Sequence, residues 1–174
     1  MPATIRGLNG ATGSQPALDA GFRLAYRIAF RLLRIWWALR RPARYGVVVA
    51  VWCGGRMLIL RQSYRAAATF PGGGLHGGED PEKAARRELL EEVGLDIPAG
   101  RLRLARDITV PFEGCEDHVR VFELALDAEP RLRPDNREVV AAEFLAPAAA
   151  LRDPDMPPYV RAYLEDRMAA AMAD

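Results

Sequence analysis

Cysteine and histidine are scarce, which limits the metal and redox chemistry that this sequence can support. Only two cysteines and two histidines occur among its 174 residues. Cys53 and Cys115 stand far apart, and the sequence has no full set of cysteines and histidines at the spacing of a zinc site. Both lie in or near apolar, strand-like sequence. We interpret them as reduced packing residues, which is typical of a protein in the reducing cytoplasm.

An excess of one charge is also absent. The chain has 24 Lys and Arg against 23 Asp and Glu, a formal net charge of +1. This balance argues against nonspecific nucleic-acid binding by the molecule as a whole. No secretion signal is apparent either, because the first apolar stretch begins near Phe22 and contains regularly spaced arginines. We expect a cytoplasmic protein.

Three segments are distinguished by composition. Residues 1–20 are rich in Gly, Ala, Thr, Ser and Pro without an apolar period, which predicts a poorly ordered tail. Residues 21–42 have helical character with arginines three or four positions apart, which predicts a basic amphipathic helix that Pro42 ends. The remaining residues, 43–174, are expected to form one compact domain, since half of the chain is apolar.

The basic helix has more than one interpretation. It also carries large aromatic residues, namely Phe22, Tyr26, Phe30, Trp36 and Trp37. This composition fits a helix whose apolar side packs on the domain or on a second subunit in a homodimer. It also fits peripheral contact with an anionic membrane surface through residues 21–41. A spanning helix is disfavoured, because each arginine at bilayer depth costs roughly 2.5 kcal/mol or more.

The domain combines strands and helices irregularly. Residues 45–53 and 56–62 predict two strands joined at a Gly54-Gly55 turn, with further strands at 102–110, 119–126 and 138–145. A helix is predicted from Pro81 to Val93, and another covers about 158–172. Because a hairpin comes first and the alternation is irregular, we expect the α/β class with a mixed sheet between helices.

Three carboxylates on the predicted helix indicate a cation site. Glu88, Glu91 and Glu92 are spaced i, i+3 and i+4, so they share one face within a single turn. Like charges so placed repel each other and gain nothing on a solvated helix. A hard cation supplies a reason for the arrangement, and oxygen ligands alone favour Mg²⁺, with Mn²⁺ as an alternative, over zinc. Magnesium so held commonly takes further ligands from substrate phosphates.

Glycines and an ion pair accompany the carboxylates. Gly72, Gly73 and Gly74 precede the helix and allow the backbone to approach a ligand closely. Arg87 lies beside the acidic face, where it can pair with Glu79 at the helix entrance. Loop and helix would then form one site.

This passage resembles the Nudix box, G-x5-E-x7-R-E-U-x-E-E-x-G-U, in which U is a bulky aliphatic residue. Every fixed position is occupied, by Gly73, Glu79, Arg87, Glu88, Leu89, Glu91, Glu92, Gly94 and Leu95. The flanking strands and the Pro71-Gly72 step extend the resemblance from about Tyr45 to the C-terminus. It implies the Nudix α/β/α sandwich, a mixed β-sheet between helices with the box as a loop-helix-loop motif.

The resemblance implies a set of metal ligands. These are the carboxylates of Glu88, Glu91 and Glu92 and the carbonyl of Gly72, with Glu79 and Arg87 as the supporting ion pair. Relatives commonly add a carboxylate from outside the box. Here Glu138 best resembles that position, and Glu113 and Glu116 in the loop 111–117 are the rivals.

The activity implied is that of a hydrolase acting on phosphorus-containing acid anhydrides. Water would attack one phosphorus of a diphosphate in a nucleoside diphosphate linked to another moiety, with magnesium as cofactor. The carboxylate that takes the proton is left open between Glu88, Glu113 and Glu116. The alternative is a catalytically silent Nudix domain that binds a nucleotide as a sensor, or that docks on a partner or a membrane.

Substrate contacts are less well marked. Arg61 and Arg65 are candidates to reach substrate phosphates from the region before Pro71. Many relatives carry a tryptophan shortly before the Pro-Gly-Gly step, whereas this sequence has a run of alanines and leaves Phe70 as the aromatic candidate. His76 is expected to be an exposed loop residue, since the box leaves its position free.

Overall fold

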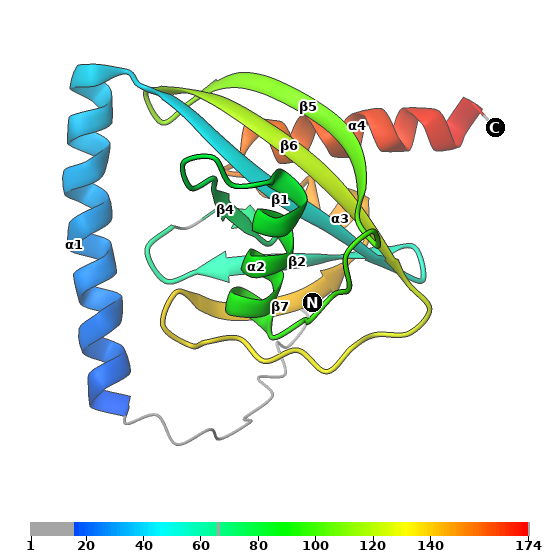
Figure 1. Ribbon diagram of the computed structural model, residues 1–174, viewed down its shortest axis with the longest axis horizontal. Helices are drawn as coiled ribbons and strands as arrows, with labels where there is room; N and C mark the ends of the chain where they lie inside the picture. Colours follow the sequence, from blue (N-terminus) through cyan, green and yellow to red (C-terminus); the bar gives the residue numbers. More distant parts are fainter. Residues whose placement is uncertain (1–15, 66, 174) are drawn as a thin grey trace.

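The domain is built on a central hairpin (Figure 1). The computed structural model describes residues 16–65 and 67–173. Strand β1 (Ala43–Cys53) and strand β2 (Arg56–Gln62) pair antiparallel, as predicted. Gly54 and Gly55 form the turn with φ angles of 54° and 75°. Positive φ at both positions matches the turn that follows the twist of the strands, and it favours glycine.

The sheet has seven strands of mixed direction. Its main path runs β3-β2-β1-β6-β5, with β4 paired to β1 and β7 paired to β2. The remaining strands are β3 (Ala68–Thr69), β4 (Gly72–Gly74), β5 (Arg103–Phe112), β6 (Cys115–Leu126) and β7 (Val139–Leu145). Strands β1 and β6 are parallel, whereas every other pair is antiparallel. The predicted strands are confirmed, and the short strands β3 and β4 are additions.

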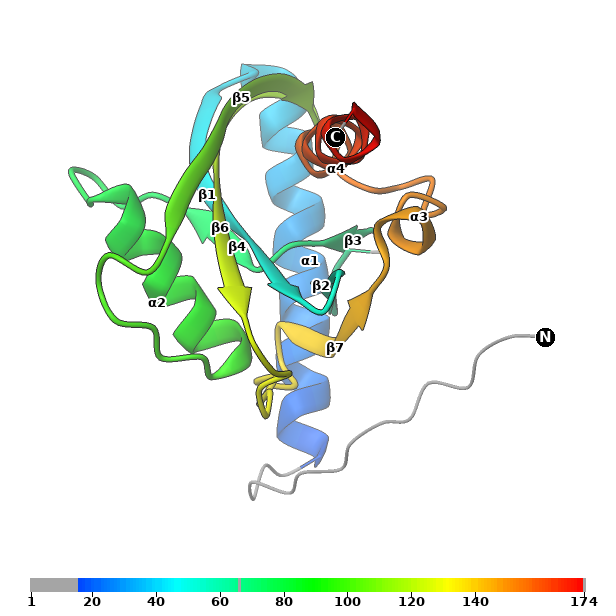
Figure 2. The ribbon, with the colours of Figure 1, turned by 90° about the vertical axis from the view of Figure 1, so that its right-hand side faces the viewer.

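Helices cover both faces of the sheet, as Figure 2 shows. Helix α2 (Pro81–Val93) lies on one face, with helices α3 (Pro147–Ala150) and α4 (Pro158–Ala173) on the other. Side chains alternate along β1, so that Val47 and Val49 pack towards α2 and Val48 packs towards α4. The predicted α/β/α sandwich is therefore confirmed. Cys53 and Cys115 are buried and free, as expected.

Helix α2 is defined by strong end signals. The Asp80 side chain accepts a hydrogen bond from the backbone N–H of Lys83, and Pro81 occupies the first turn. Gly94 ends the helix in the left-handed conformation at φ 72°. Its buried side packs Leu89 against the sheet. These caps fix the position of the carboxylates relative to the glycine loop.

Helix α1 (Pro16–Arg40) begins five positions earlier than the predicted start at residue 21. Asp19 lies in its first turn, is buried and forms an ion pair with Arg137 at 3.2 Å, which the local sequence could not reveal. The helix therefore takes over residues 16–20 of the predicted tail, and residues 1–15 of that tail lie outside the described residues. Figure 1 shows α1 standing beside the domain, along one edge.

Gly72 in β4 gives a direct test of how closely the box loop approaches the sheet. Its φ is +152°, and a Cβ placed there would lie 2.2 Å from the backbone oxygen of Val47. We predict that Gly72→Ala lowers the free energy of unfolding by about 2 kcal/mol or more, since both strain and steric overlap result. The matched control is Gly74→Ala on the same strand, where a Cβ would meet nothing within 4 Å. Equal urea midpoints for the two variants would contradict this packing.

Candidate active site

The three carboxylates of α2 differ in exposure. Glu92 is buried at 5% exposure, whereas the side chains of Glu88 and Glu91 are 13% and 59% exposed. The helical period places all three on neighbouring positions of one face. Exposure therefore increases along this face, from Glu92 beneath the glycine loop to Glu91 in solvent.

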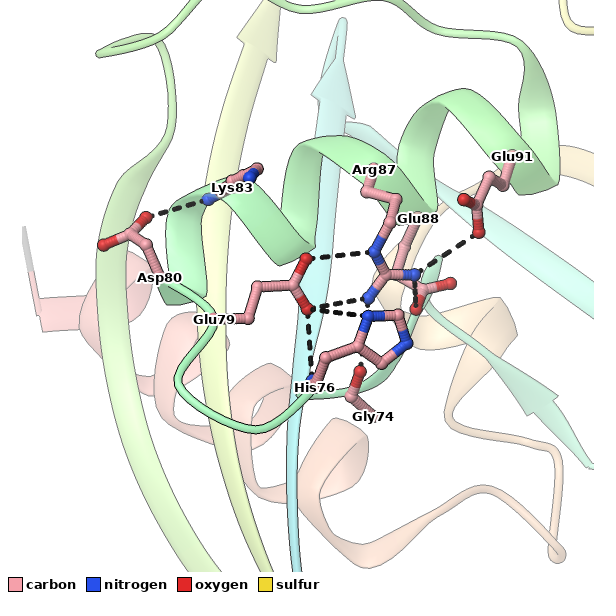
Figure 3. Close-up of polar contacts among 8 residues, drawn as sticks. All are labelled: Gly74, His76, Glu79, Asp80, Lys83, Arg87, Glu88 and Glu91. Atoms are coloured by element: carbon pink, nitrogen blue, oxygen red, sulfur yellow. Dashed lines mark hydrogen bonds and ion pairs between the residues drawn. The ribbon is translucent and has the colours of Figure 1, made fainter.

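Arg87 is the centre of the polar contacts in Figure 3. Its guanidinium donates to both carboxylate oxygens of Glu79 at 3.1 Å, which forms the predicted ion pair. It also donates to Glu88 at 2.7 Å, to Glu91 at 3.3 Å and to the carbonyl oxygen of Gly74 at 3.3 Å. Arg87 thus fastens the loop to the helix and offsets part of the acidic charge.

These contacts change the acidity of the groups involved. Hydrogen bonding from Arg87 lowers the pKa of Glu79 to about 2, with a further contribution from the backbone N–H of His76. The same bond to Glu79 raises the pKa of Arg87 above its ordinary value. Both groups therefore stay charged at neutral pH, and the loop anchor is an ion pair throughout that range.

Glu92 connects the helix to the sheet. Its Oε2 accepts a hydrogen bond of 2.8 Å from the backbone N–H of Gly72. Burial raises the pKa of Glu92 well above the ordinary range, and the nearby carboxylates of Glu88 and Glu138 add to the rise. Burial likewise raises the pKa of Glu88, although Arg87 opposes it. Without a cation, an ionised Glu92 is costly in this position.

A cavity of about 480 Å³ opens beside this face. It brings together five of the predicted metal and substrate contacts, namely Gly72, Glu88, Glu91, Glu138 and Arg65. Glu92 borders it through the hydrogen bond to Gly72. This volume suits a small-molecule ligand.

Glu138 reaches the cavity from the loop before β7. Its Oε1 accepts a hydrogen bond of 2.6 Å from the Tyr64 hydroxyl. Burial and the adjacent Glu138 carboxylate raise the pKa of Tyr64, so that its hydroxyl remains a donor. Glu138 therefore lines the cavity with its carboxylate oriented by the Tyr64 hydroxyl.

The chemistry of the lining residues fits a hard divalent cation. Glu88, Glu91 and Glu138 offer carboxylate oxygens, and the buried Oε1 of Gln62, which also lines the cavity, has no hydrogen-bond partner among the described residues. Within residues 16–65 and 67–173, no group of three or more acidic, histidine or cysteine side chains lies close enough together to form a ready-made metal site. Arg87 occupies one oxygen each of Glu88 and Glu91.

The rival carboxylates do not line the cavity. Glu113, at the tip of the β5-β6 hairpin, forms an ion pair with Arg65 at 2.8 Å and lies 3.7 Å from a guanidinium nitrogen of Arg44. Glu116 is 63% exposed and lies 3.0 Å from the ring of His118. Neither is among the residues that line the cavity.

The structure places two of the predicted substrate contacts away from the carboxylate cavity. Arg61 points to the α3 side of the sheet, where it lies 3.8 Å from Asp153 and lines a separate pocket. Its neighbour Gln62 lines the carboxylate cavity instead, because adjacent strand residues face opposite sides. Phe70 is 1% exposed and packs edge-on against Tyr163, so it belongs to the core. His76 is exposed, as expected.

Several cavity residues escaped sequence reasoning. These are Trp37, Arg44, Gln62, Tyr64 and Asp117. Their contacts join segments far apart in the chain, such as Arg44 and Asp117, whose carboxylate accepts two hydrogen bonds from the guanidinium at 2.5 and 2.7 Å. The one local signal was the position of Asp117 on β6, where it shares the alternating pattern of the apolar residues Cys115 and Val119.

Comparison with known proteins points to one family. The family profile described as the NUDIX domain matches residues 42–165 of the chain. A curated relative, the RNA pyrophosphohydrolase of Bartonella bacilliformis, is 39% identical over 64 residues, which cover 31% of this chain. The match spans 38% of that relative's length.

Solved structures share the fold at low sequence identity. The MutT protein from Methanosarcina mazei Go1 is 21% identical with a TM-score of 0.62, and the match covers 75% of this chain and 97% of that chain. For the C. elegans Ap4A hydrolase the identity is 19%, the coverage 75% and 99%, and the TM-score 0.61. The NUDIX domain of Shewanella oneidensis NrtR, complexed with ADP ribose, is 13% identical, with coverage of 74% and 88% and a TM-score of 0.61.

Burial of Glu92 predicts a pH effect on stability in EDTA. A carboxyl whose pKa is raised by folding stabilises the fold below its ordinary pKa of about 4.5, and this contribution is lost as the pH rises through the folded-state pKa. We predict that wild-type protein loses more unfolding free energy between pH 5 and pH 8 than Glu92→Gln does. The difference should exceed the roughly 0.5 kcal/mol that is typical of surface substitutions.

Urea unfolding at both pH values measures this difference. Glu165→Gln is the control, because Glu165 is an exposed carboxylate on α4. It should follow the wild type. Identical pH dependence in wild type and Glu92→Gln would mean that ionisation of Glu92 does not lower the free energy of unfolding.

Proposed function

The chain belongs to the NUDIX domain family, and we propose that it hydrolyses a diphosphate linkage in a nucleoside diphosphate joined to another moiety. The observation that carries the proposal is the single cavity that is lined by carboxylates of α2, by Glu138 and by the glycine loop. Acidic oxygens in this number suit a cation that in turn suits phosphate. The relatives named as pyrophosphohydrolase and Ap4A hydrolase support the same reaction class.

We propose Mg²⁺ or Mn²⁺ as cofactor, held by the carboxylates of Glu88, Glu91, Glu92 and Glu138 and the carbonyl of Gly72. A cation bound there neutralises phosphate oxygens and lowers the pKa of an attacking water. Arg87 and Glu79 position the ligands by holding the loop against the helix. Gly72 provides the close approach, because a side chain at that position would overlap the backbone of β1.

Glu88 is our candidate for the carboxylate that accepts the proton of the attacking water. It lines the cavity, and burial raises its pKa above the ordinary value against the opposing effect of Arg87, which favours uptake of a proton. Glu113 is held by Arg65, and Glu116 lies beside His118 outside the cavity lining. Of these three residues, Glu88 alone is among those that line the cavity, which supports it as the base.

Hydrolysis by the purified protein tests the proposal. We predict that a panel of nucleoside diphosphate derivatives, including ADP-ribose and dinucleoside polyphosphates, contains a substrate cleaved with Mg²⁺ or Mn²⁺ and not with EDTA. Glu88→Gln should lower kcat by about 10²-fold or more, the contribution typical of a positioned base. His76→Ala should keep most of the activity, because the His76 side chain is 73% exposed, and His76, whose ring lies 3.6 Å from Glu79, is not among the residues that line the carboxylate cavity.

The outcomes separate enzyme from sensor. Turnover that survives complete chelation would show that hydrolysis does not need a divalent cation. Nucleotide binding without turnover of any substrate would favour a nucleotide-binding sensor over a hydrolase.

We further propose that the outer face of α1 contacts an anionic membrane surface. This face exposes large apolar side chains at helical spacing, including Leu24, Ile28, Leu32, Ile35 and Leu39, with exposures from 52% to 79%. In Figure 1 one side of α1 faces away from the domain. No helix in the described ranges has the length and apolarity of a membrane span. The surface therefore fits peripheral contact.

Charge favours a lipid surface over a second copy of the chain. Arg31 and Arg34 are exposed on α1, and the helix has no acidic residue after Asp19, which is buried against Arg137. Packing two such helices together would bring arginines towards arginines. Anionic headgroups would instead attract them, by about 1 kcal/mol for each basic residue near the surface.

Vesicle sedimentation tests this surface. We predict binding of the full-length protein to vesicles that contain anionic phospholipid and not to neutral ones. The double variant Leu32→Glu, Ile35→Glu should lose binding, whereas Leu104→Glu on β5, at 48% exposure, should retain it. A dimer in solution that the double variant breaks, without vesicle binding by the wild type, would assign this face to a second copy.

A further inference from the structure

Helix α1 ends at Arg40, before the region that matches the family profile begins at residue 42. Its inner face nevertheless contacts the loops that line the carboxylate cavity, and its own Trp37 is one of the lining residues. In Figure 1 the helix runs past the ends of the strands from which these loops emerge. A segment outside the family domain thus takes part in shaping the pocket.

Aromatic packing connects α1 with Glu138. The Tyr64 ring lies against Phe30, with centroids 4.9 Å apart, and stacks on Tyr26 at 6.0 Å. The Tyr64 hydroxyl then donates to Glu138 at 2.6 Å. These contacts of α1 set the orientation of a carboxylate on the cavity wall.

Arginines of α1 fasten the same two loops. Arg27 donates to the carbonyl oxygen of Ser63 at 3.0 Å, and Arg23 donates to that of Asn136 at 2.9 Å. The loops are joined to each other through the N–H of Ser63, which donates to the carbonyl of Glu138 at 2.7 Å. The inner face of α1 is therefore bound to the domain by polar contacts as well as aromatic ones.

Arg65 lies between two aromatic rings at the cavity. Its guanidinium carbon is 5.1 Å from the centroid of Phe30 and 5.4 Å from that of Phe112. One nitrogen is paired with Glu113, but the buried Nε has no hydrogen-bond partner among the described residues. A buried donor of this kind is costly unless an acceptor oxygen reaches it.

Arg44 is held in a corresponding way. Its guanidinium carbon lies 4.0 Å from the centroid of Trp37, and Asp117 fixes it through two hydrogen bonds. Arg44, Trp37 and Asp117 all line the cavity. Trp36, the next residue on α1, is 49% exposed and is absent from that lining.

We propose that the inner face of α1 completes the substrate pocket, with Trp37 and Phe30 holding Arg44 and Arg65 ready for the anionic oxygens of the diphosphate. This inference rests on the proposed function. The carboxylates of α2 and Glu138 repel a diphosphate, and two oriented guanidinium groups in the same cavity offset that repulsion. Trp37 and Phe30 are thus positioning residues that act through the arginines.

This arrangement predicts an effect on substrate binding more than on the chemical step. The arginines contact charge that the substrate carries before as well as during the reaction, so their loss removes uniform binding. Trp37→Ala should raise KM about tenfold with less than a threefold change in kcat. Trp37→Phe should recover most of the loss, because a ring remains for Arg44 to stack on.

Trp36→Ala is the matched control in lipid-free buffer. It removes the same side chain from the adjacent position, on the solvent side of α1, and should keep the wild-type KM. Thermal melting of each variant shows whether it is folded. Binding of α,β-methylene-ADP, measured by titration calorimetry, supplies a readout that does not need turnover, and Trp37→Ala should weaken it about tenfold.

The outcomes distinguish this inference from the proposed function. If the wild type hydrolyses a diphosphate and a folded Trp37→Ala matches it in KM and in analogue affinity, α1 does not form part of the pocket. An equal loss in Trp36→Ala would likewise assign the effect to helix stability. If the wild type neither cleaves nor binds any diphosphate, the proposed function itself fails.

Discussion

The burial of acidic charge on α2 is the constraint around which the site is arranged. Glu92 is enclosed beneath the glycine loop, and Glu88 lies one turn away. Like charges at this spacing in a poorly solvated setting destabilise one another. The protein offsets the cost with the Arg87 guanidinium and with the backbone N–H of Gly72. This arrangement of carboxylates is the basis of the proposal that the site holds a divalent cation, which also suits phosphate.

Charge of both signs meets in the cavity, and this combination gives the site its chemical character. Acidic oxygens come from α2 and from Glu138, while Arg44 and Arg65 are fixed by acids and by aromatic rings. A diphosphate needs both, because its oxygens bind cations and guanidinium groups alike. Helix α1 contacts both sets of groups. Its Phe30 packs against Tyr64, which donates a hydrogen bond to Glu138, and the ring of its Trp37 lies against Arg44. The family domain and the added helix thus jointly define the pocket.

Local sequence signals predicted α2, its caps and the relation of Glu79 to Arg87, since each depends on residues within a few turns. The short strands β3 and β4 were missed, because three residues or fewer carry no detectable period. Arg61 was misplaced because its side of β2 is decided by the sheet, and Phe70 because a core position looks like a stacking platform in sequence. The contacts of Trp37 and Tyr64 join distant segments, so no spacing rule could find them.

Direct titration with Mn²⁺, followed by electron paramagnetic resonance of the free ion, tests the central claim that these carboxylates hold a divalent cation. The account predicts that wild-type protein binds Mn²⁺ without substrate, and that Mg²⁺ competes for the site. Binding should be lost in the double variant Glu88→Gln, Glu92→Gln and retained in Glu165→Gln, whose exposed carboxylate lies on α4. Absence of binding by the wild type, or undiminished binding by a folded double variant, would contradict the account.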